Sequence, residues 1–161
     1  MIYPNAYPAY LGRADFYSQN GFYEKALKDI NAALSLKPDY TEALRQKGTV
    51  LLLSGDARSA IKIYTDMLNV NPNDVTLLNN RAAACLSLRM FAEAKADLDK
   101  SINLDAGQID PYYNRSIVFI EYQQYALALK DIEHVLKTAP GHALARSQYQ
   151  KLKGLMSADG S

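Results

Sequence analysis

The sequence has little of the chemistry that metal centres and disulfide-linked folds require. It contains one cysteine, two histidines and no tryptophan among 161 residues. A single cysteine cannot form an intramolecular disulfide, and one cysteine with two histidines cannot build a cysteine-rich zinc site or an iron–sulfur cluster. We therefore expect no metal, no cofactor and a fold held together by side-chain packing alone.

A surplus of charge is also missing. Eighteen lysines and arginines face seventeen aspartates and glutamates, so the net charge is +1 with both histidines neutral. This balance produces no bulk field that would attract a polyanion, and it argues against nucleic-acid binding. Hydrophobic residues make up 48% of the chain, which predicts a folded core rather than disorder.

Long apolar runs are absent as well. The longest candidate, residues 49–53, is far shorter than the roughly 18 residues of a membrane span, so we expect no membrane insertion. The first residues have neither a basic nor an extended apolar region, so we expect no secretory signal in this chain. A single thiol suits the reducing cytoplasm, which is the location we expect. An extracytoplasmic location stays open if a signal or a larger chain was removed.

What the sequence does contain is an internal repeat of 34 residues, which aligns the chain with itself four times without a gap. Two columns spaced four residues apart are apolar in every copy. The first holds Ala26, Ala60, Ala94 and Ala128, and the second holds Ile30, Tyr64, Leu98 and Ile132.

A second set of columns precedes these in each copy and alternates large, small and large residues at i, i+4 and i+7. The large residues are Tyr10, Leu44, Leu78 and Tyr112, then Tyr17, Leu51, Cys85 and Phe119; the small ones are Ala14, Gly48, Ala82 and Ser116. This spacing places the side chains on one helical face, so each copy is predicted to hold two amphipathic helices. The small column allows the two helices to approach closely.

Turn and capping residues fall between the predicted helices. Gly21 and Gly55 lie between the helices of the first two copies, and Pro38 is among the residues that close a copy. We predict Asp56 as an N-cap and Asp110 as an N-cap followed by proline at the first helical position.

A helix–turn–helix unit of 34 residues with this order of large and small residues resembles the tetratricopeptide repeat family. The resemblance covers 7–40, 41–74, 75–108 and 109–142, followed by a capping helix at 143–156, with tails at 1–6 and 157–161. It implies an all-α fold, a right-handed superhelical α-solenoid of antiparallel helix pairs. A terminal helix with one apolar face and one solvated face is what such an array needs at its end.

No combination of residues predicts catalysis. His134 and His142 have no serine, cysteine or carboxylate pair at a motif spacing, and Cys85 occupies a core column. We therefore interpret Cys85 as a small buried hydrophobe rather than a redox nucleophile, and we expect no enzyme activity.

In arrays resembling this family the first helices line a concave groove, and the residue two positions before the small column faces that groove. This position reads Gly12, Gln46, Asn80, Asn114 and, in the capping helix, Gln148. A carboxamide both donates and accepts, which suits the main chain of an extended peptide; the alternative is a merely solvated polar face. The predicted peptide-binding residues are Arg45, Gln46, Thr49, Asn79, Asn80, Ala83, Tyr113, Asn114 and Ile117.

Chaperone-binding members of the family hold a ligand carboxylate with a clamp of basic and asparagine side chains. Arg45 and Asn80 could fill two clamp positions, but Thr49, Asp110 and Asn114 occupy the others, and Asp110 has the wrong sign. A degenerate clamp is the most that this resemblance implies.

The residue after each amide position is basic in every repeat, and these residues are called the basic ladder below. They are Arg13, Lys47, Arg81 and Arg115. We expect these side chains to pack between helices, with their charged ends near the recurring carboxylates Asp29, Asp97 and Asp131. The alternative is a stripe that binds phosphate or acidic groups.

The sequence thus predicts a non-enzymatic protein–protein interaction module that binds an extended peptide or partner segment in its groove. We expect a monomer, or weak self-association, and a protein or peptide partner. Two alternatives stay open. One is a structural module that assembles through its ends or its convex face, and the other is a co-chaperone-like adaptor with a degenerate carboxylate clamp.

Overall fold

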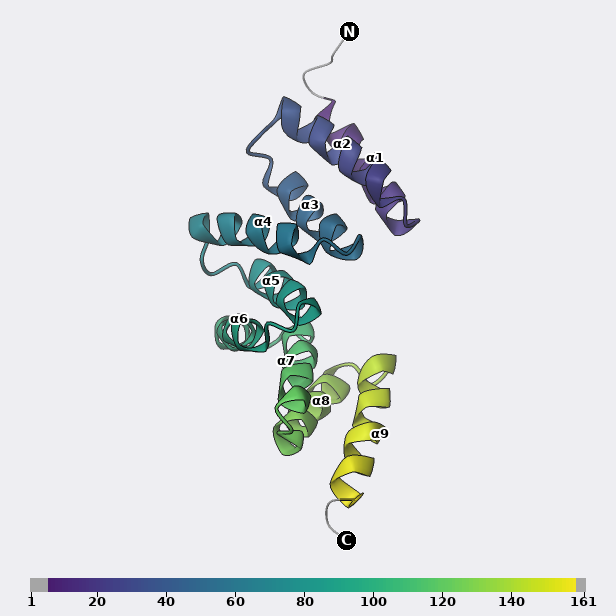
Figure 1. The fold of residues 1–161 in the computed structure, drawn as a ribbon, viewed down its shortest axis with the longest axis vertical. Helices are drawn as coiled ribbons and strands as arrows, with labels where there is room; N and C mark the ends of the chain where they lie inside the picture. The colour runs from purple at the N-terminus through teal and green to yellow at the C-terminus, as the bar shows by residue number, and fades with distance from the viewer. Residues whose placement is uncertain (1–5, 159–161) are drawn as a thin grey trace. The chain divides into compact units, whose positions relative to one another are not determined.

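The computed structural model describes residues 6–158, and within this range the chain forms nine α-helices and no strand (Figure 1). Their bounds are α1 Tyr7–Gln19, α2 Tyr23–Leu36, α3 Thr41–Leu53, α4 Ala57–Val70, α5 Val75–Ser87, α6 Phe91–Leu104, α7 Asp110–Glu121, α8 Tyr125–Thr138 and α9 Ala143–Ala158. The predicted all-α class is confirmed, and each predicted repeat holds one helix pair. The capping helix runs two residues past its predicted end. Residues 1–5 and 159–161 of the predicted tails lie outside the described range.

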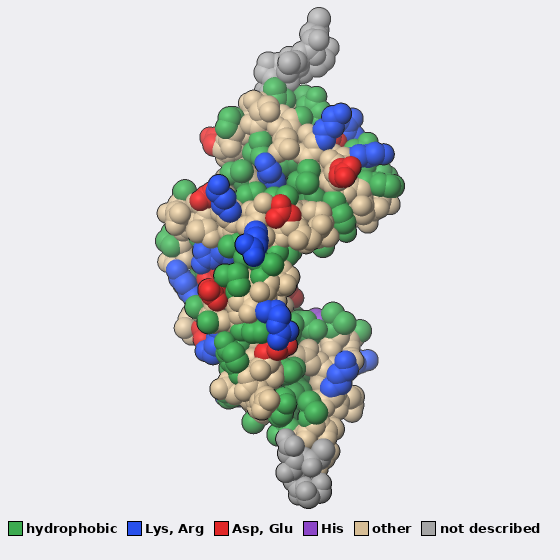
Figure 2. Space-filling view, viewed as in Figure 1, with side chains coloured by type: hydrophobic (Ala, Val, Ile, Leu, Met, Phe, Trp, Pro, Cys, Tyr) green, Lys and Arg blue, Asp and Glu red, His purple; other side chains and the backbone are tan. Residues whose placement is uncertain are grey.

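The chain divides into two compact units, one containing α1–α4 and one containing α5–α9. Inside each unit, consecutive helices pack against each other as antiparallel pairs (Figure 1). First helices of neighbouring repeats also meet within a unit, because α1 contacts α3 and α5 contacts α7. Figure 2 shows lysine and arginine interspersed with aspartate and glutamate on the visible face of both units, in keeping with the balanced composition.

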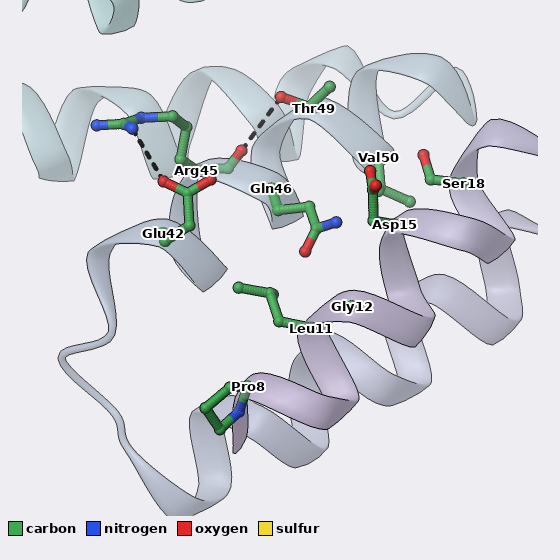
Figure 3. Close-up of a pocket in the computed structure, with 10 residues that line it drawn as sticks. All are labelled: Pro8, Leu11, Gly12, Asp15, Ser18, Glu42, Arg45, Gln46, Thr49 and Val50. Atoms are coloured by element: carbon green, nitrogen blue, oxygen red, sulfur yellow. Dashed lines mark hydrogen bonds and ion pairs between the residues drawn. The ribbon is translucent and has the colours of Figure 1, made fainter. Parts of the chain in front are cut away.

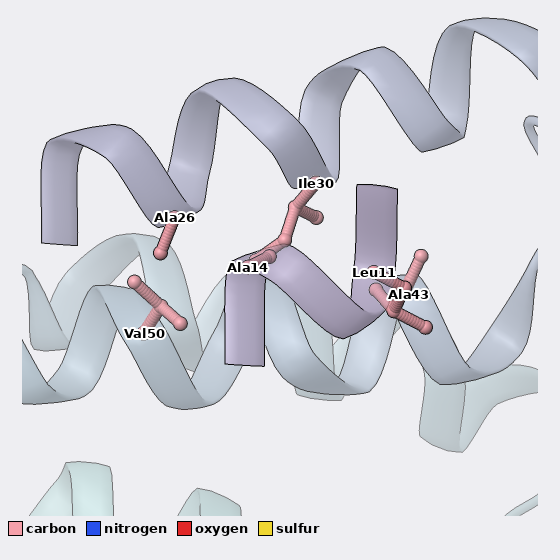
Figure 4. Close-up of a cluster of buried hydrophobic side chains, with 6 residues drawn as sticks. All are labelled: Leu11, Ala14, Ala26, Ile30, Ala43 and Val50. Carbon is pink, nitrogen blue, oxygen red and sulfur yellow. The ribbon is translucent and has the colours of Figure 1, made fainter. Parts of the chain in front are cut away.

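The repeated columns form the core. All four alanines of the first apolar column are fully buried, and the residues four positions later are at most 1% exposed. In the first unit the core cluster joins α1, α2 and α3 through Leu11, Ala14, Ala26, Ile30, Ala43 and Val50 (Figure 4). In the second unit, α9 adds Ala145 and Leu152 to the apolar flank of α8. Its outward positions are polar for most of its length, with exposed leucines at Leu144 and Leu155.

The second repeat shows why the small column is small. A Cβ atom added at Gly48 would lie 2.6 Å from Cε1 and 2.7 Å from Cζ of Tyr64, which is 1% exposed. The Tyr64 hydroxyl lies 3.1 Å from Thr49 Oγ1, and this contact holds the ring in place. Repeat one has Ala14 and Ile30 at the same two positions, so a larger residue in the second helix is matched by a smaller one in the first.

The turn inside each helix pair places one residue in the left-handed backbone region, at the same position of every repeat. The four residues are Gly21 (φ 75°), Gly55 (φ 94°), Arg89 (φ 58°) and Gln123 (φ 58°). Glycine adopts this conformation without cost, whereas arginine and glutamine do so with strain from their Cβ atoms. The last two repeats therefore have the same turn as the first two, but a less suitable residue in it.

The predicted caps had mixed outcomes. Asp56 caps α4, because its Oδ1 accepts the backbone N–H of Ser59 at 3.1 Å. The prediction for Asp110 is wrong: α7 begins at Asp110 itself, with Pro111 in its first turn and no capping bond from a side chain among the described residues. One residue of extra helix moves the carboxylate from the cap to the first turn, where it still faces the positive end of the helix dipole. Asp74, which sequence reasoning missed, caps α5.

Candidate functional site

Helices α1 and α3 of the first unit enclose a hollow with a volume of about 470 Å³, called the α1–α3 hollow below (Figure 3). Three predicted peptide-binding residues, Arg45, Gln46 and Thr49, line one side of it from α3. The α1 side presents Leu11 and Gly12, and the remaining lining residues are Pro8, Asp15, Ser18, Glu42 and Val50. The surface is thus a mixture of apolar side chains, hydroxyls, one amide and three charged groups.

Most polar groups of the hollow are engaged within the first unit. Arg45 Nη1 donates to Glu42 Oε2 at 3.0 Å, so the two side chains form a neutral pair one helical turn apart. Thr49 Oγ1 donates to the Arg45 carbonyl at 3.2 Å as well as contacting Tyr64. Asp15 accepts a hydrogen bond from the neutral amide of Gln19 at 2.8 Å. With Arg45 and Glu42 cancelling, the hollow carries one negative charge, at Asp15.

Gln46 differs from these groups. Its Oε1 atom is buried and has no hydrogen-bond partner among the described residues. Figure 3 shows the amide end of Gln46 directed into the hollow, opposite Leu11 and Gly12 of α1. A buried carbonyl oxygen without a donor is energetically unfavourable, so a ligand N–H that reaches this atom as the side chain turns into the hollow relieves the cost.

The other six predicted residues lie in the second unit, on α5 and α7. Asn114 Nδ2 donates to Asn79 Oδ1 at 2.9 Å, which joins α7 to α5. Asn80, Ala83, Tyr113 and Ile117 are half-buried on the same two helices. In the capping helix, Gln148 Nε2 donates to Ser116 Oγ at 3.1 Å. The side-chain amides of Asn114 and Gln148 therefore hold neighbouring helices together. Sequence position alone did not distinguish this role from ligand binding.

The basic ladder packs as predicted in three repeats. Each arginine makes a two-pronged contact with the aspartate 16 residues later: Arg13 with Asp29 (2.6 and 2.8 Å), Arg81 with Asp97 (2.7 and 2.7 Å) and Arg115 with Asp131 (2.8 and 2.8 Å). The three aspartates are buried. Hydrogen bonding to these aspartates raises the pKa of each arginine. The ladder joins the two helices of a repeat, which favours packing over the phosphate-binding alternative.

The residues considered for chemistry have structural partners. Cys85 is 2% exposed, and burial raises its pKa to about 11, so the thiol is protonated at neutral pH as expected for a core residue. The His134 ring stacks on Tyr112 with centroids 3.9 Å apart. His142 Nδ1 accepts the backbone N–H of Ala145 at 3.1 Å and so caps α9, which sequence reasoning missed.

Searches for two other kinds of site are negative within residues 6–158. No group of three or more histidine, cysteine, aspartate or glutamate side chains in that range could hold a metal ion. None of the helices of the described chain has the length and apolar character needed to cross a membrane.

Tandem helix pairs of constant length, with buried small residues between the helices and a mixed polar surface on the first helices, define an α-helical repeat protein. The family model for the tetratricopeptide repeat matches residues 7–40 and 75–108, which are two of the four predicted repeats. The chain therefore contains tetratricopeptide repeats in these two segments. Residues 41–74 and 109–142 contain helix pairs in which the two second-helix columns are buried in the same way.

Similar proteins of known identity share this region. Serine/threonine-protein phosphatase 5 of Rattus norvegicus is 29% identical over 110 residues, covering 68% of this chain and 22% of the relative. The heat shock protein sti1 homolog of Schizosaccharomyces pombe is 39% identical over 92 residues, covering 57% of this chain and 15% of the relative. The chain therefore spans about a fifth of the length of the curated relatives it matches first.

Among solved structures, the first tetratricopeptide repeat domain of Spaghetti (RPAP3), bound to the HSP90 peptide SRMEEVD, is 28% identical with a TM-score of 0.68. The alignment covers 71% of this chain and 93% of that one. These likenesses place the fold among the tetratricopeptide repeat solenoids.

Proposed function

We propose that this chain is a protein-interaction module that binds an extended peptide segment on the first-helix surface of its repeats, by shape and main-chain hydrogen bonds and without a covalent step. The observation that carries the proposal is the α1–α3 hollow, which combines apolar walls with the unpartnered amide oxygen of Gln46. An extended peptide exposes both N–H and C=O groups along its length, and an amide side chain can bind either. Peptide binding by a similar repeat domain supports this assignment.

One observation favours the co-chaperone-like alternative and another opposes it. The similar domain of Spaghetti (RPAP3) binds the peptide SRMEEVD, in which three of the last four residues are acidic. In this chain the hollow carries a negative charge at Asp15. The positive charge of Arg45 is already neutralised by its ion pair with Glu42. Like charges facing each other cost affinity, so an acidic C-terminus is a poor match. Isothermal titration with SRMEEVD tests this directly, and micromolar binding would favour the alternative.

Partner capture tests the main proposal. Affinity purification with cross-linking, performed on the full chain, should place the partner on α1, α3, α5 and α7. Combined replacement of Gln46, Asn80 and Asn114 by alanine should weaken capture while circular dichroism shows that the helices persist. Because Asn114 bonds Asn79, the single Gln46→Ala variant is needed to separate lost binding from loosened packing. Undiminished capture by both variants would contradict the proposal.

The assembly alternative is favoured by exposed leucines on the cap. Leu144 is 62% exposed and Leu155 is 45% exposed, whereas Leu152 is buried at 1% and supports the fold. A test of self-association must therefore replace Leu144 and Leu155, not Leu152. Size-exclusion chromatography with light scattering should show a monomer for the wild-type chain if the peptide-binding proposal is right. Concentration-dependent oligomers that disappear in the Leu144→Ser, Leu155→Ser variant would favour assembly.

We also propose a cytoplasmic location, because the one thiol of the chain is free and buried. Imaging of a tagged full-length protein tests this assignment.

A further inference from the structure

We propose that peptide recognition is concentrated in the first unit, where Gln46 Oε1 accepts a backbone N–H from the peptide and Asp15 binds an adjacent lysine or arginine side chain. The ligand is then an internal basic segment of a protein rather than an acidic C-terminus. This inference rests on the proposed function and names the class of peptide that the α1–α3 hollow binds.

The first step compares the carboxamides, which look equivalent in sequence. Asn114 donates to Asn79, located on the preceding first helix of the second unit. Leu11 occupies the same repeat position as Asn79 but precedes Gln46. A leucine side chain can neither donate nor accept, so the preceding first helix offers no partner to either end of the Gln46 amide. The unpartnered Oε1 is left for a ligand donor.

The second step concerns the space in front of this amide. Gly12 occupies the carboxamide column in the first repeat, and a Cβ atom added there would meet no other atom within 4 Å. The absence of a side chain keeps the hollow open on the α1 side, as Figure 3 shows. A peptide backbone can therefore approach Gln46 closely, with small apolar side chains against Pro8 and Leu11.

The third step is the charge. Glu42 and Arg45 neutralise each other at 3.0 Å, and the Asp15 carboxylate contacts only the neutral amide of Gln19 among the described residues. Asp15 is exposed and lines the same hollow as Gln46. A cationic side chain of the peptide is complementary to this surface, whereas a terminal carboxylate is repelled.

A library of N-acetylated, C-amidated decapeptides tests the inference, with a matched library that has free C-terminal carboxylates. The wild-type chain should enrich lysine or arginine at one position of the amidated library and should not prefer the free carboxylates. Asp15→Asn should remove the basic preference while retaining peptides. Gln46→Ala should lower retention, and Gln150→Ala on the exposed side of α9 is the matched control. A basic preference that survives Asp15→Asn would overturn the inference.

The hydrogen bond itself is tested with the best enriched peptide. Replacing each backbone amide by an ester, one at a time, removes one N–H; a single position should weaken binding about 3- to 10-fold. The same ester should have no effect on Gln46→Ala. Gly12→Asn supplies an internal partner for Gln46 and should reduce binding without unfolding the chain, whereas Gly12→Ala should bind as the wild type does. Equal ester effects on wild type and Gln46→Ala would contradict the assignment.

The outcomes separate this inference from the proposed function. If peptides bind the Gln46→Ala variant normally but are lost from Asn80→Ala, the chain is a peptide-binding module whose site lies in the second unit, and the inference fails alone. If neither library is enriched above a denatured control, the proposed function fails as well.

Discussion

Replacement of Gly48 by alanine should destabilise the chain, although the same change stabilises most helices. Alanine in a helix interior is favoured over glycine by about 1 kcal/mol. At Gly48 the added Cβ would lie 2.6 Å from the Tyr64 ring. This ring is buried and its hydroxyl is hydrogen-bonded to Thr49, so the whole ring must shift to relieve the clash. Overpacking of this kind costs about 1 to 3 kcal/mol. The expected net change is a loss of about 1 kcal/mol.

The decisive variant combines Gly48→Ala with Tyr64→Leu, which places in repeat two the residues that Ala82 and Leu98 provide in repeat three. Tyr64→Leu alone should destabilise the chain by about 2 kcal/mol, because it loses packing and the hydroxyl contact with Thr49. In this background the steric conflict is gone, and Gly48→Ala should stabilise by about 1 kcal/mol. The interaction between the two sites is therefore about 2 kcal/mol.

Urea unfolding of the wild type, both single variants and the double variant, followed by circular dichroism, measures this cycle. Both changes lie in the first unit, so a transition in two steps would assign the effect to the earlier or later step. An m-value common to all four proteins supports the comparison of midpoints. If Gly48→Ala changes the free energy of unfolding in the same direction in both backgrounds, the close approach to Tyr64 is not the reason that position 48 is glycine.

Three further predictions follow from backbone conformation, a buried ion pair and burial of the thiol. Gln123→Gly should stabilise the chain by about 0.5 to 1 kcal/mol in thermal unfolding, because it removes a left-handed conformation from a residue with a Cβ atom; Gly21→Ala, at φ 75°, should do the opposite. Asp131→Ala should cost about 3 kcal/mol, since it leaves the half-buried Arg115 without its two-pronged partner, and a loss below 1 kcal/mol would show that Asp99 alone suffices. The Cys85 pKa rises from 9.0 to about 11 on folding. The contribution of this thiol to the free energy of unfolding is therefore fully present below pH 9 and is lost as the pH rises through 11. A Cys85→Ala variant should show a smaller decline in unfolding experiments between pH 8 and 11, because burial also raises the pKa of Tyr64 and of Tyr113 and these two groups retain their share.

Local features of the fold follow from the sequence to a large extent. Fixed spacing puts Ala26 and Ile30, and their counterparts, on one helical face, and the structure buries them. Pairing of Arg13 with Asp29 was predictable for the same reason, because both recur at constant positions of the repeat. Asp110 shows the limit: whether a carboxylate before proline caps a helix or begins it depends on a shift of one residue in the helix start, which the chemical preference of aspartate does not settle.

The candidate site was only partly predictable. The amide column lies on the first helices, and Arg45, Gln46 and Thr49 line a hollow there. Sequence position could not show that the Asn114 amide nitrogen has an acceptor in Asn79, on a helix about one repeat away, whereas Gln46 Oε1 has no donor among the described residues. Asp15 was not among the predicted site residues, and its place in the hollow is set by the geometry of α1 and α3.

By itself, the sequence determined the helix pairs, their length and the residues between them, because helix periodicity and side-chain volume are properties of neighbours along the chain. The tertiary structure decided which polar groups are satisfied and which face a hollow. Hydrogen-bond partners and open space depend on atoms from other helices. The separation of two residues along the chain does not give the distance between them in the folded protein.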